Sequence, residues 1–212
     1  MAPSKLAAAV EVRDLPRDVR DAIDMYMPRG IPPLSAHYYV QAEYVRLVRS
    51  RAQAERNAER WSRYVDELSD KLPNLSVKDV TNYVGDNCYQ VDILLHPGLD
   101  LPDDPADLLG TLRRGVRIAS IYASFLAPAW WMGVQKIVRV GSRGSRRSWE
   151  SPQRSPAQKV RLVADEVLGT LGWLRLSTEQ VRQKIADLSV HGKTPGESRV
   201  GHVLFSNNLD FS

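Results

Sequence analysis

The chain has 212 residues, of which 43% are apolar and 25% are charged. This balance is typical of a globular protein and sufficient for one substantial hydrophobic core. The formal net charge is +4 and the isoelectric point is near 9.3, so the chain is mildly basic. The single cysteine, Cys88, excludes an internal disulfide and favours a cytoplasmic location. The apolar run at 6–10 stops at Glu11, which is too short for a secretory signal.

The first predicted element is a helix over Leu15–Met27, with Pro16 in its first turn and apolar residues on one stripe. A Pro/Gly connector follows at 28–33. A long helix is then predicted over Ala36–Leu72, where Pro73 ends it. Its apolar residues recur every three or four positions along one face. They are Val40, Tyr44, Leu47, Ala54, Ala58, Trp61, Val65, Leu68 and Leu72.

Two features of this long helix have alternative interpretations. The aromatic and β-branched residues at 37–40 also suit a short strand that leads into a helix beginning near Ala42. The apolar stripe suits either a coiled-coil seam between chains or the spine of a single domain. We favour the spine, because alanines and Arg51 would make a weak seam.

The middle of the chain predicts a mixture of helices and strands. Ser76 and Asp79 form a variant of the capping box, which predicts a short helix up to Gly85. Residues 87–95 alternate in polarity and predict a strand. An acidic cap followed by Pro105 predicts a helix from about 103 to 127, and 130–140 has strand character.

Residues 118–135 contain no charged side chain, so this stretch reaches the lower limit for a membrane-spanning helix. Pro128 and Gly133 within it argue against that interpretation. We expect instead a buried helix end followed by a buried strand.

The last third begins with a Ser/Arg/Gly/Pro loop over 141–156, which we expect to be exposed and mobile. Pro156 opens a predicted helix that runs to about Thr170, and 173–176 is an apolar link. A capping box at 177–180 starts another helix that extends to about Leu188. Residues 199–206 have strand character.

The helices and strands do not alternate strictly, and this order indicates an α+β fold. We expect a helix-rich single domain with one long helix in its N-terminal half and a small, mainly antiparallel sheet. In this division, residues 1–34 form an N-terminal extension with a short helix, and 35–212 form the domain.

The sequence shows no recognisable catalytic or metal-binding constellation. Its four histidines are scattered, and none has a second His or Cys three or four residues away. The letters GSRGS at 141–145 lack the lysine and the spacing of a phosphate-binding loop. Cys88 lies within a predicted strand, where a buried thiol is commoner than a nucleophile. We therefore expect no enzymatic activity, no metal and no cofactor, although an enzyme class without a short motif stays open.

The loop at 141–156 is the strongest local candidate for a binding site. It contains four arginines and only one acidic residue, so most of the net charge is local. Together with a tryptophan, these arginines suit phosphates of a nucleic acid or an acidic protein partner. The candidate partner-binding residues are Arg143, Arg146, Arg147, Trp149 and Arg154.

Two parts of the chain resemble bacterial immunity proteins, which neutralise polymorphic toxins in the cytosol. One part is the C-terminal region, with the letters GWLRLS at 172–177 and LFS at 204–206. The other is the aromatic segment YYV at 38–40 with the helix that ends before Pro73. The resemblance implies a surface that covers a toxin and no active site. The basic charge departs from the pattern, because immunity proteins against nucleases are often acidic.

These observations favour a cytoplasmic, non-enzymatic binding protein that neutralises a cognate bacterial toxin. The alternative is a nucleic-acid-binding protein that uses the arginines of 141–156. The identity of the partner and the oligomeric state stay open at this level.

Overall fold

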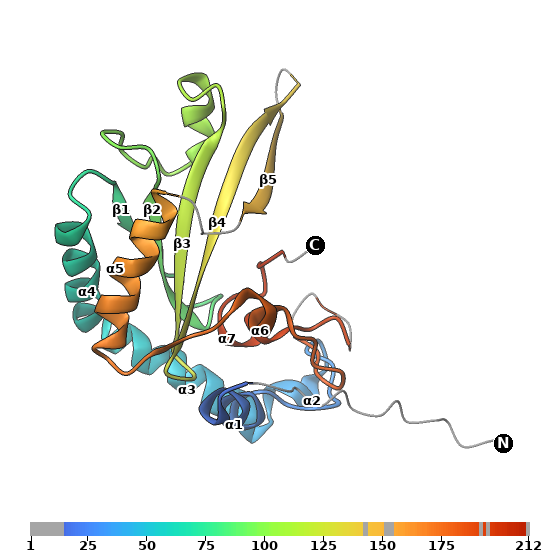
Figure 1. Ribbon diagram of the computed structural model, residues 1–212. Coiled ribbons are helices and arrows are strands. Elements are labelled where there is room, and N and C mark those ends of the chain that lie inside the picture. Colours follow the sequence, from blue (N-terminus) through green and yellow to red (C-terminus); the bar gives the residue numbers. More distant parts are fainter. Residues whose placement is uncertain (1–14, 142–143, 151–154, 191–192, 194–195, 211–212) are drawn as a thin grey trace.

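The computed structural model describes residues 15–141, 144–150, 155–190, 193 and 196–210. These residues form an α+β fold, as predicted, in which helices pack on a mainly antiparallel sheet (Figure 1). The helices are α1 Arg17–Tyr26, α2 Ala36–Tyr39, α3 Ala42–Arg56, α4 Ala58–Lys71, the 3-10 helix η1 Pro105–Gly110, α5 Ala157–Gly169, α6 Thr178–Arg182 and α7 Val200–Leu204.

Six strands make one sheet in the order β1-β2-β3-β4-β5, and these five are antiparallel neighbours. The short β6 pairs in parallel with the start of β4, at Ala129 and Trp130. The strands are β1 Val77–Asp79, β2 Cys88–Leu94, β3 Val116–Ser124, β4 Ala129–Val140, β5 Gly144–Glu150 and β6 Leu174–Arg175.

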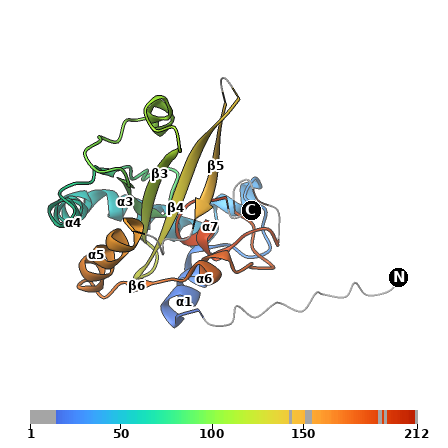
Figure 2. The same ribbon diagram turned by 45° about the horizontal axis from the view of Figure 1, so that its top comes forward.

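Each face of the sheet has its own hydrophobic cluster, because successive side chains of a strand point to opposite faces. On one face, Val91, Ile121 and Met132 are neighbours in register and pack with α4 and α5. On the other face, Tyr122 and Trp131 pack with α1, α6 and α7. Both ribbon views show α4 and α5 together on one side of the sheet (Figures 1 and 2).

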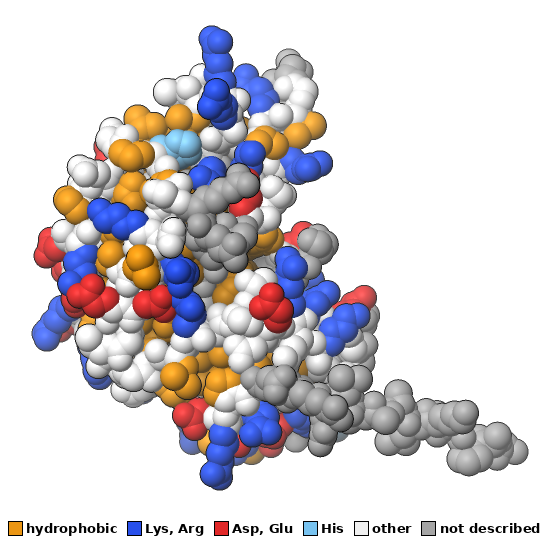
Figure 3. All heavy atoms as spheres, viewed as in Figure 1, with side chains coloured by type: hydrophobic (Ala, Val, Ile, Leu, Met, Phe, Trp, Pro, Cys, Tyr) orange, Lys and Arg blue, Asp and Glu red, His pale blue; other side chains and the backbone are white. Residues whose placement is uncertain are grey.

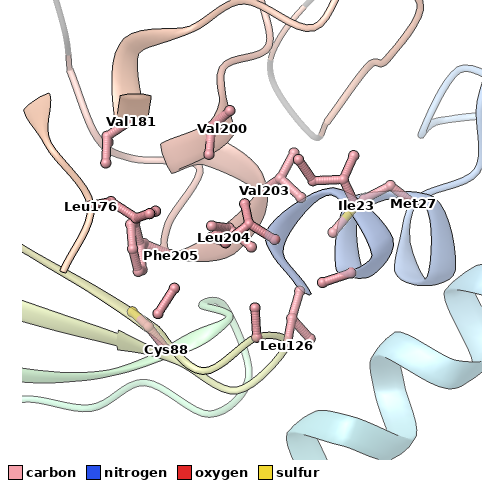
Figure 4. Close-up of a cluster of buried hydrophobic side chains, with 14 of the residues drawn as sticks. Ile23, Met27, Cys88, Leu126, Leu176, Val181, Val200, Val203, Leu204 and Phe205 are labelled. Carbon is pink, nitrogen blue, oxygen red and sulfur yellow. The ribbon is translucent and has the colours of Figure 1, made fainter. Parts of the chain in front are cut away.

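The second cluster joins parts of the chain that are distant in sequence. Ile23 of α1 and Met27 just after it lie beside Val203 and Leu204 of α7, and Cys88 at the start of β2 lies below Phe205 (Figure 4). The helix predicted within residues 1–34 is therefore present as α1, and its buried side contributes to this core. Residues 1–14 lie outside the described residues, and the division at 34 stays a prediction.

The apolar stripe predicted over 36–72 is buried or partly buried except at Val40, but it is divided between two helices, α3 and α4. Leu47, Ala54, Trp61 and Leu68 are each at most 5% exposed and pack against the rest of the same chain. The stripe is therefore a spine of the fold, as the favoured interpretation expected. The predicted helix is interrupted before α3 and again at Asn57. The alternative start near Ala42 is confirmed, because α3 begins there. Residues 36–39 form a helical turn and not a strand.

Two predicted helices in the middle of the chain are wrong. Val77–Asp79 forms β1 against Val91–Ile93, and Asp79 closes a turn by accepting from the Thr81 amide. The helix predicted over 103–127 is limited to η1, where Asp104 and Pro105 act as the expected start. Gly115 then turns the chain into β3, so 118–135 is a buried hairpin of two strands.

Gly115 explains why the helix does not continue. Its φ of +96° favours glycine, and a side chain there would lie 2.6 Å from the carbonyl oxygen of Ile137. The chain therefore turns at Gly115, and the residues after it form β3 and not a further part of the predicted helix. None of the helices in the described part of the chain combines the length and the apolar character that crossing a membrane requires.

Predictions for the C-terminal third are partly confirmed. The helix opened by Pro156 is α5, and the capping box of Ser177 and Gln180 is present at α6. That helix ends at Arg182 and does not reach Leu188 as expected. The strand predicted over 199–206 is wrong, because 200–204 is the short helix α7. Burial on every side removes the polarity pattern that distinguishes a strand from a helix.

Candidate binding surface

A groove with a volume of about 230 Å³ lies between α2, α3, the loop before β2 and the C-terminal segment. Three tyrosines contribute to its wall, together with apolar and amide side chains. The groove is lined by Met27, Pro33, Tyr38, Tyr39, Tyr44, Leu47, Arg51, Val84, Gly85, Asn87, Val190 and Asn207.

The three tyrosines form one cluster of mutually contacting rings. The ring centroids of Tyr38 lie 5.8 Å from Tyr39 and 5.3 Å from Tyr44, and Tyr39 and Tyr44 are 5.1 Å apart. The Tyr39 ring is edge-on to both of the others, a favourable arrangement for aromatic pairs. Burial raises the pKa of Tyr38 to about 12, so its hydroxyl is neutral at physiological pH.

The interruption between α2 and α3 brings these rings together. Tyr38 and Tyr39 belong to α2, whereas Tyr44 is in the first turn of α3. Gln41 adopts an extended backbone between the two helices, and its side chain donates to the carbonyl of His37. A continuous helix would not place an extended residue at this point, so the break creates one wall of the groove.

Arg51 of α3 connects this wall to the loop before β2. Its guanidinium donates to Asn87 Oδ1 at 2.9 Å, to the Val84 carbonyl at 2.9 Å and to the Gly85 carbonyl at 3.4 Å. The side-chain amide nitrogen of Asn87 in turn donates to the Val203 carbonyl of α7 at 2.7 Å. Burial lowers the pKa of Arg51, although an arginine stays charged at physiological pH. These contacts hold the groove open in one arrangement.

The surroundings of the groove expose an unusual share of apolar side chains. Leu34 and Val40 are 79% and 72% exposed and adjoin the lining residues Pro33 and Tyr39, while Val84 is 86% exposed. Figure 3 shows hydrophobic side chains at the surface of the lower part of the molecule, where α1 and α3 lie. Seven of the ten large hydrophobic residues exposed in the described ranges come from 25–48 or from the loop before β2: Met25, Leu34, Tyr39, Val40, Val45, Val48 and Val84.

The basic segment predicted as a loop contains a strand. Residues 144–150 form β5, which pairs with β4 through the register Ile137 with Arg147 and Val138 with Arg146. Neighbouring residues of a strand point to opposite faces, so Arg146 and Arg147 do not share one surface. Arg143 and Arg154 lie outside the described residues.

The loop prediction failed because β5 consists mostly of serines and arginines. It therefore lacks the alternation of apolar and polar residues that predicts a strand. Its backbone hydrogen bonds to β4 are satisfied without apolar side chains. Trp149, a predicted partner-binding residue, instead packs onto the sheet. Its ring lies over Gly133, and its centroid is 5.4 Å from that of Trp131.

The end of the sheet nevertheless carries arginines without acidic partners. Arg113, Arg114, Arg139, Arg146 and Arg147 are exposed, and none forms an ion pair with a described acidic residue. Figure 3 shows basic side chains at this upper end of the molecule. Two other basic side chains there form ion pairs with Glu150: Arg117 at 3.0 Å and Lys136 at 3.7 Å.

The other residues considered from the sequence have structural roles. Cys88 is fully buried in the second cluster, and burial raises the pKa of its thiol well above the usual value, which disfavours the reactive thiolate. His96 Nε2 accepts from the Arg117 amide at 3.0 Å. Within the described ranges, no three His, Cys, Asp or Glu side chains gather as metal ligands.

Sequence reasoning missed the tyrosine groove. The aromatic segment 38–40 was noted, but the groove is also lined by Arg51, Val84 and Asn207, which lie far from it in the chain. Comparison with models of known families, with curated proteins and with solved structures finds no match. The resemblance to immunity proteins therefore rests on the short motifs alone.

Proposed function

We propose that this chain is a protein-binding protein that receives an apolar side chain of its partner in the tyrosine groove. The observation that carries the proposal is the exposed apolar surface around a preformed groove lined by Tyr38, Tyr39 and Tyr44. Exposed apolar patches on soluble proteins are typical of interaction sites, and tyrosine is enriched among residues that dominate binding energy.

The groove is suited to binding because its walls are already ordered. Arg51 and Asn87 hold α3, the loop before β2 and α7 in contact through hydrogen bonds between 2.7 and 3.4 Å. A partner would therefore lose little free energy in ordering this surface. Tyr39, which is 46% exposed, offers both a ring for packing and a hydroxyl for hydrogen bonding.

We further propose that the partner is a bacterial toxin, and that binding covers its functional surface. Two of the resembling segments support this identity, because 38–40 lines the groove and the LFS segment is hydrogen-bonded to a residue of its wall. Residues 38–40 contribute two tyrosines to its wall. In the LFS segment at 204–206, Phe205 accepts from the Asn87 backbone amide at 2.7 Å, directly behind the groove.

The test uses the purified chain and the product of a toxin gene adjacent to its own, with mass measured by light scattering. We expect a complex with the wild-type chain and loss of that complex for Val40→Glu, which places a charge beside Tyr39. Leu162→Glu is the matched control, because Leu162 is 55% exposed on α5. Co-expression should restore growth of toxin-producing cells with the wild type and the control only.

Two results would contradict the proposal. One is a toxin that is neither bound nor neutralised by the wild-type chain. The other is a complex that tolerates Val40→Glu as well as it tolerates Leu162→Glu, since binding would then occur elsewhere.

Nucleic-acid binding is the second candidate, favoured by the five exposed arginines without described acidic partners at the β4–β5 end. A two-stranded ribbon fits the major groove of DNA, where phosphates lie on both sides. Arginines on opposite faces of β5 suit that geometry. The test is fluorescence anisotropy with a short duplex, where affinity should fall steeply with salt. Absence of binding at low salt, or an unchanged affinity in Arg139→Ala/Arg146→Ala/Arg147→Ala, excludes this site.

A further inference from the structure

A second cavity, of about 360 Å³, lies at the junction between α3 and α4. It is separate from the tyrosine groove, since no residue lines both. Its volume falls within the range of small-molecule sites, which is roughly 300–1,000 Å³. The walls come from α3 and α4, from β2, from the turn between β3 and β4 at 124–128, and from the segment between α5 and β6.

Aromatic rings make the main wall of this cavity. Trp61, Tyr89 and Trp173 are nearly parallel, with interplanar angles of 15° to 18°. The Trp61 and Tyr89 centroids are 4.6 Å apart, and each lies 6.4 Å from Trp173. Phe125 stands edge-on to Tyr89 at 4.7 Å. Such a wall stacks against a flat conjugated ring better than against a bulky aliphatic group.

The polar groups of the wall are only partly satisfied within the chain. The Tyr89 hydroxyl donates to the Ala54 carbonyl at 3.2 Å, and Ser50 donates to the Phe125 carbonyl at 3.3 Å. By contrast, the indole nitrogen of Trp61 is buried without a hydrogen-bond partner among the described residues. This nitrogen is enclosed, so it is an unsatisfied donor within the wall and not a contact for a ligand.

The charge at the rim is positive. Arg60 Nε donates to the Tyr64 hydroxyl at 3.2 Å, which orients the guanidinium, and the residue is exposed. No described acidic residue forms an ion pair with Arg60, and none lines the cavity. A cation in the aromatic wall would therefore face an unopposed arginine, whereas an anion would gain a charge-assisted hydrogen bond.

We infer that this cavity binds a small molecule with a planar conjugated ring and one anionic substituent, carboxylate or phosphate. The ring stacks on the wall formed with Trp173, and the anionic group pairs with Arg60. This site goes beyond the proposed binding of a protein partner and does not depend on it.

The experiment is isothermal titration calorimetry on the full chain with three probes of similar size. Indole-3-acetate has the ring and the anion, tryptamine has the ring and a cation, and cyclohexylacetate has the anion without a conjugated ring. We expect saturable binding of indole-3-acetate and weaker binding of both others. Adenosine monophosphate, tested in parallel, distinguishes a phosphate-bearing ligand from a carboxylate-bearing one.

Variants assign the binding to this cavity. Arg60→Ala should weaken indole-3-acetate by about fivefold, the size expected for an exposed charge pair, and leave tryptamine unchanged or tighter. Arg63→Ala, which removes another exposed arginine of α4, is the control and should bind as the wild type does. Trp173→Ala should weaken binding by at least about tenfold, because stacking is lost, while Trp173→Phe retains most of it.

The inference is overturned if neither indole-3-acetate nor adenosine monophosphate binds saturably at millimolar concentration. It is also overturned if tryptamine binds more tightly than indole-3-acetate, or if Arg60→Ala and Arg63→Ala have the same affinity. Arg60 is exposed, so its replacement does not threaten folding and the result is decisive even if Trp173→Ala is unstable.

Discussion

At the tyrosine groove, Arg51 donates to three acceptors, whereas at the β4–β5 hairpin Arg139, Arg146 and Arg147 are exposed and form no ion pair with a described acid. The groove is held by hydrogen bonds between segments that are distant in sequence. The hairpin is held by its backbone ladder, by Trp149 and by the ion pairs of Glu150, while its exposed arginines form no ion pair with a described acid. The same residue type therefore supports structure in one region and is available for binding in the other.

The largest expected effect is the loss of Arg51. Arg51→Ala leaves the Asn87 side chain and two carbonyls without their donor, and should lower the free energy of unfolding by about 2–3 kcal/mol. Urea denaturation measures the change. Arg49→Ala, which alters an exposed arginine of the same helix, should stay within about 0.5 kcal/mol of the wild type. Equal stability of the two variants would show that Arg51 does not hold the groove.

A second effect tests how the hairpin is attached to the sheet. In Gly133→Ala the new Cβ would overlap the ring of Trp149 and approach Trp131 to 2.7 Å. We expect a loss of about 1–3 kcal/mol from overpacking, measured by urea denaturation. Gly169→Ala is the control, because its Cβ would meet no atom within 4 Å. If both variants unfold alike, Trp149 moves aside without cost and does not anchor β5.

The third effect is a pH dependence of the segment behind the groove. Burial lowers the pKa of His202 from its ordinary value of 6.5. Its Nδ1 accepts from the Arg199 amide at 3.1 Å, so protonation would place two donors face to face. A depressed pKa contributes stability that is complete above 6.5 and is lost as pH falls through the folded-state pKa.

Burial raises the pKa of Asp86 and of Asp92, so these carboxyl groups oppose the loss. Against that background, His202 should lower the stability that urea denaturation measures at pH 5.0 relative to pH 7.5. His96, whose pKa burial also lowers, acts in the same direction, so His202→Gln should reduce the slope without removing it. If His202→Gln leaves the pH dependence of the unfolding free energy unchanged, protonation of His202 is not coupled to folding.

The smallest effect on stability is expected for the hairpin arginines. Arg139→Ala/Arg146→Ala/Arg147→Ala should change the free energy of unfolding by less than about 0.5 kcal/mol, because these side chains make no ion pair with described acids. Raising the salt concentration should leave the variant's stability close to that of the wild type. A large destabilisation would show that the hairpin depends on its side chains, and the contrast with the groove would fail.

The sequence predicted those elements whose pattern is local. The stripe of Leu47, Ala54, Trp61 and Leu68 was read correctly as one buried face, because a seven-residue spacing keeps these positions on one side of a helix. The strand at 87–95 was confirmed as β2, where polar and apolar residues alternate. The capping box at Ser177 was also confirmed, since it depends on only four successive residues.

The incorrect predictions arose where pairing partners decide the structure. Val77–Asp79 resembles a capped helix start but pairs with β2, and 116–124 resembles a helix stripe but pairs on both edges. Residues 144–150 have no apolar periodicity and are a strand because β4 supplies the ladder. For the candidate site, the sequence named Arg146 and Arg147 but could not show that they point to opposite faces, since that follows from the strand β5.

By itself, the sequence determined the α+β class, the helical spine and the lack of a recognisable catalytic motif, because periodicity, capping and residue spacing are short-range properties. Only the tertiary structure decided where the candidate binding surfaces lie. The tyrosine groove needs α2, α3, Val84 and Asn207 to meet, and the aromatic cavity needs Trp61, Tyr89 and Trp173 to become parallel. Both depend on contacts between segments far apart in the chain, which local patterns do not encode.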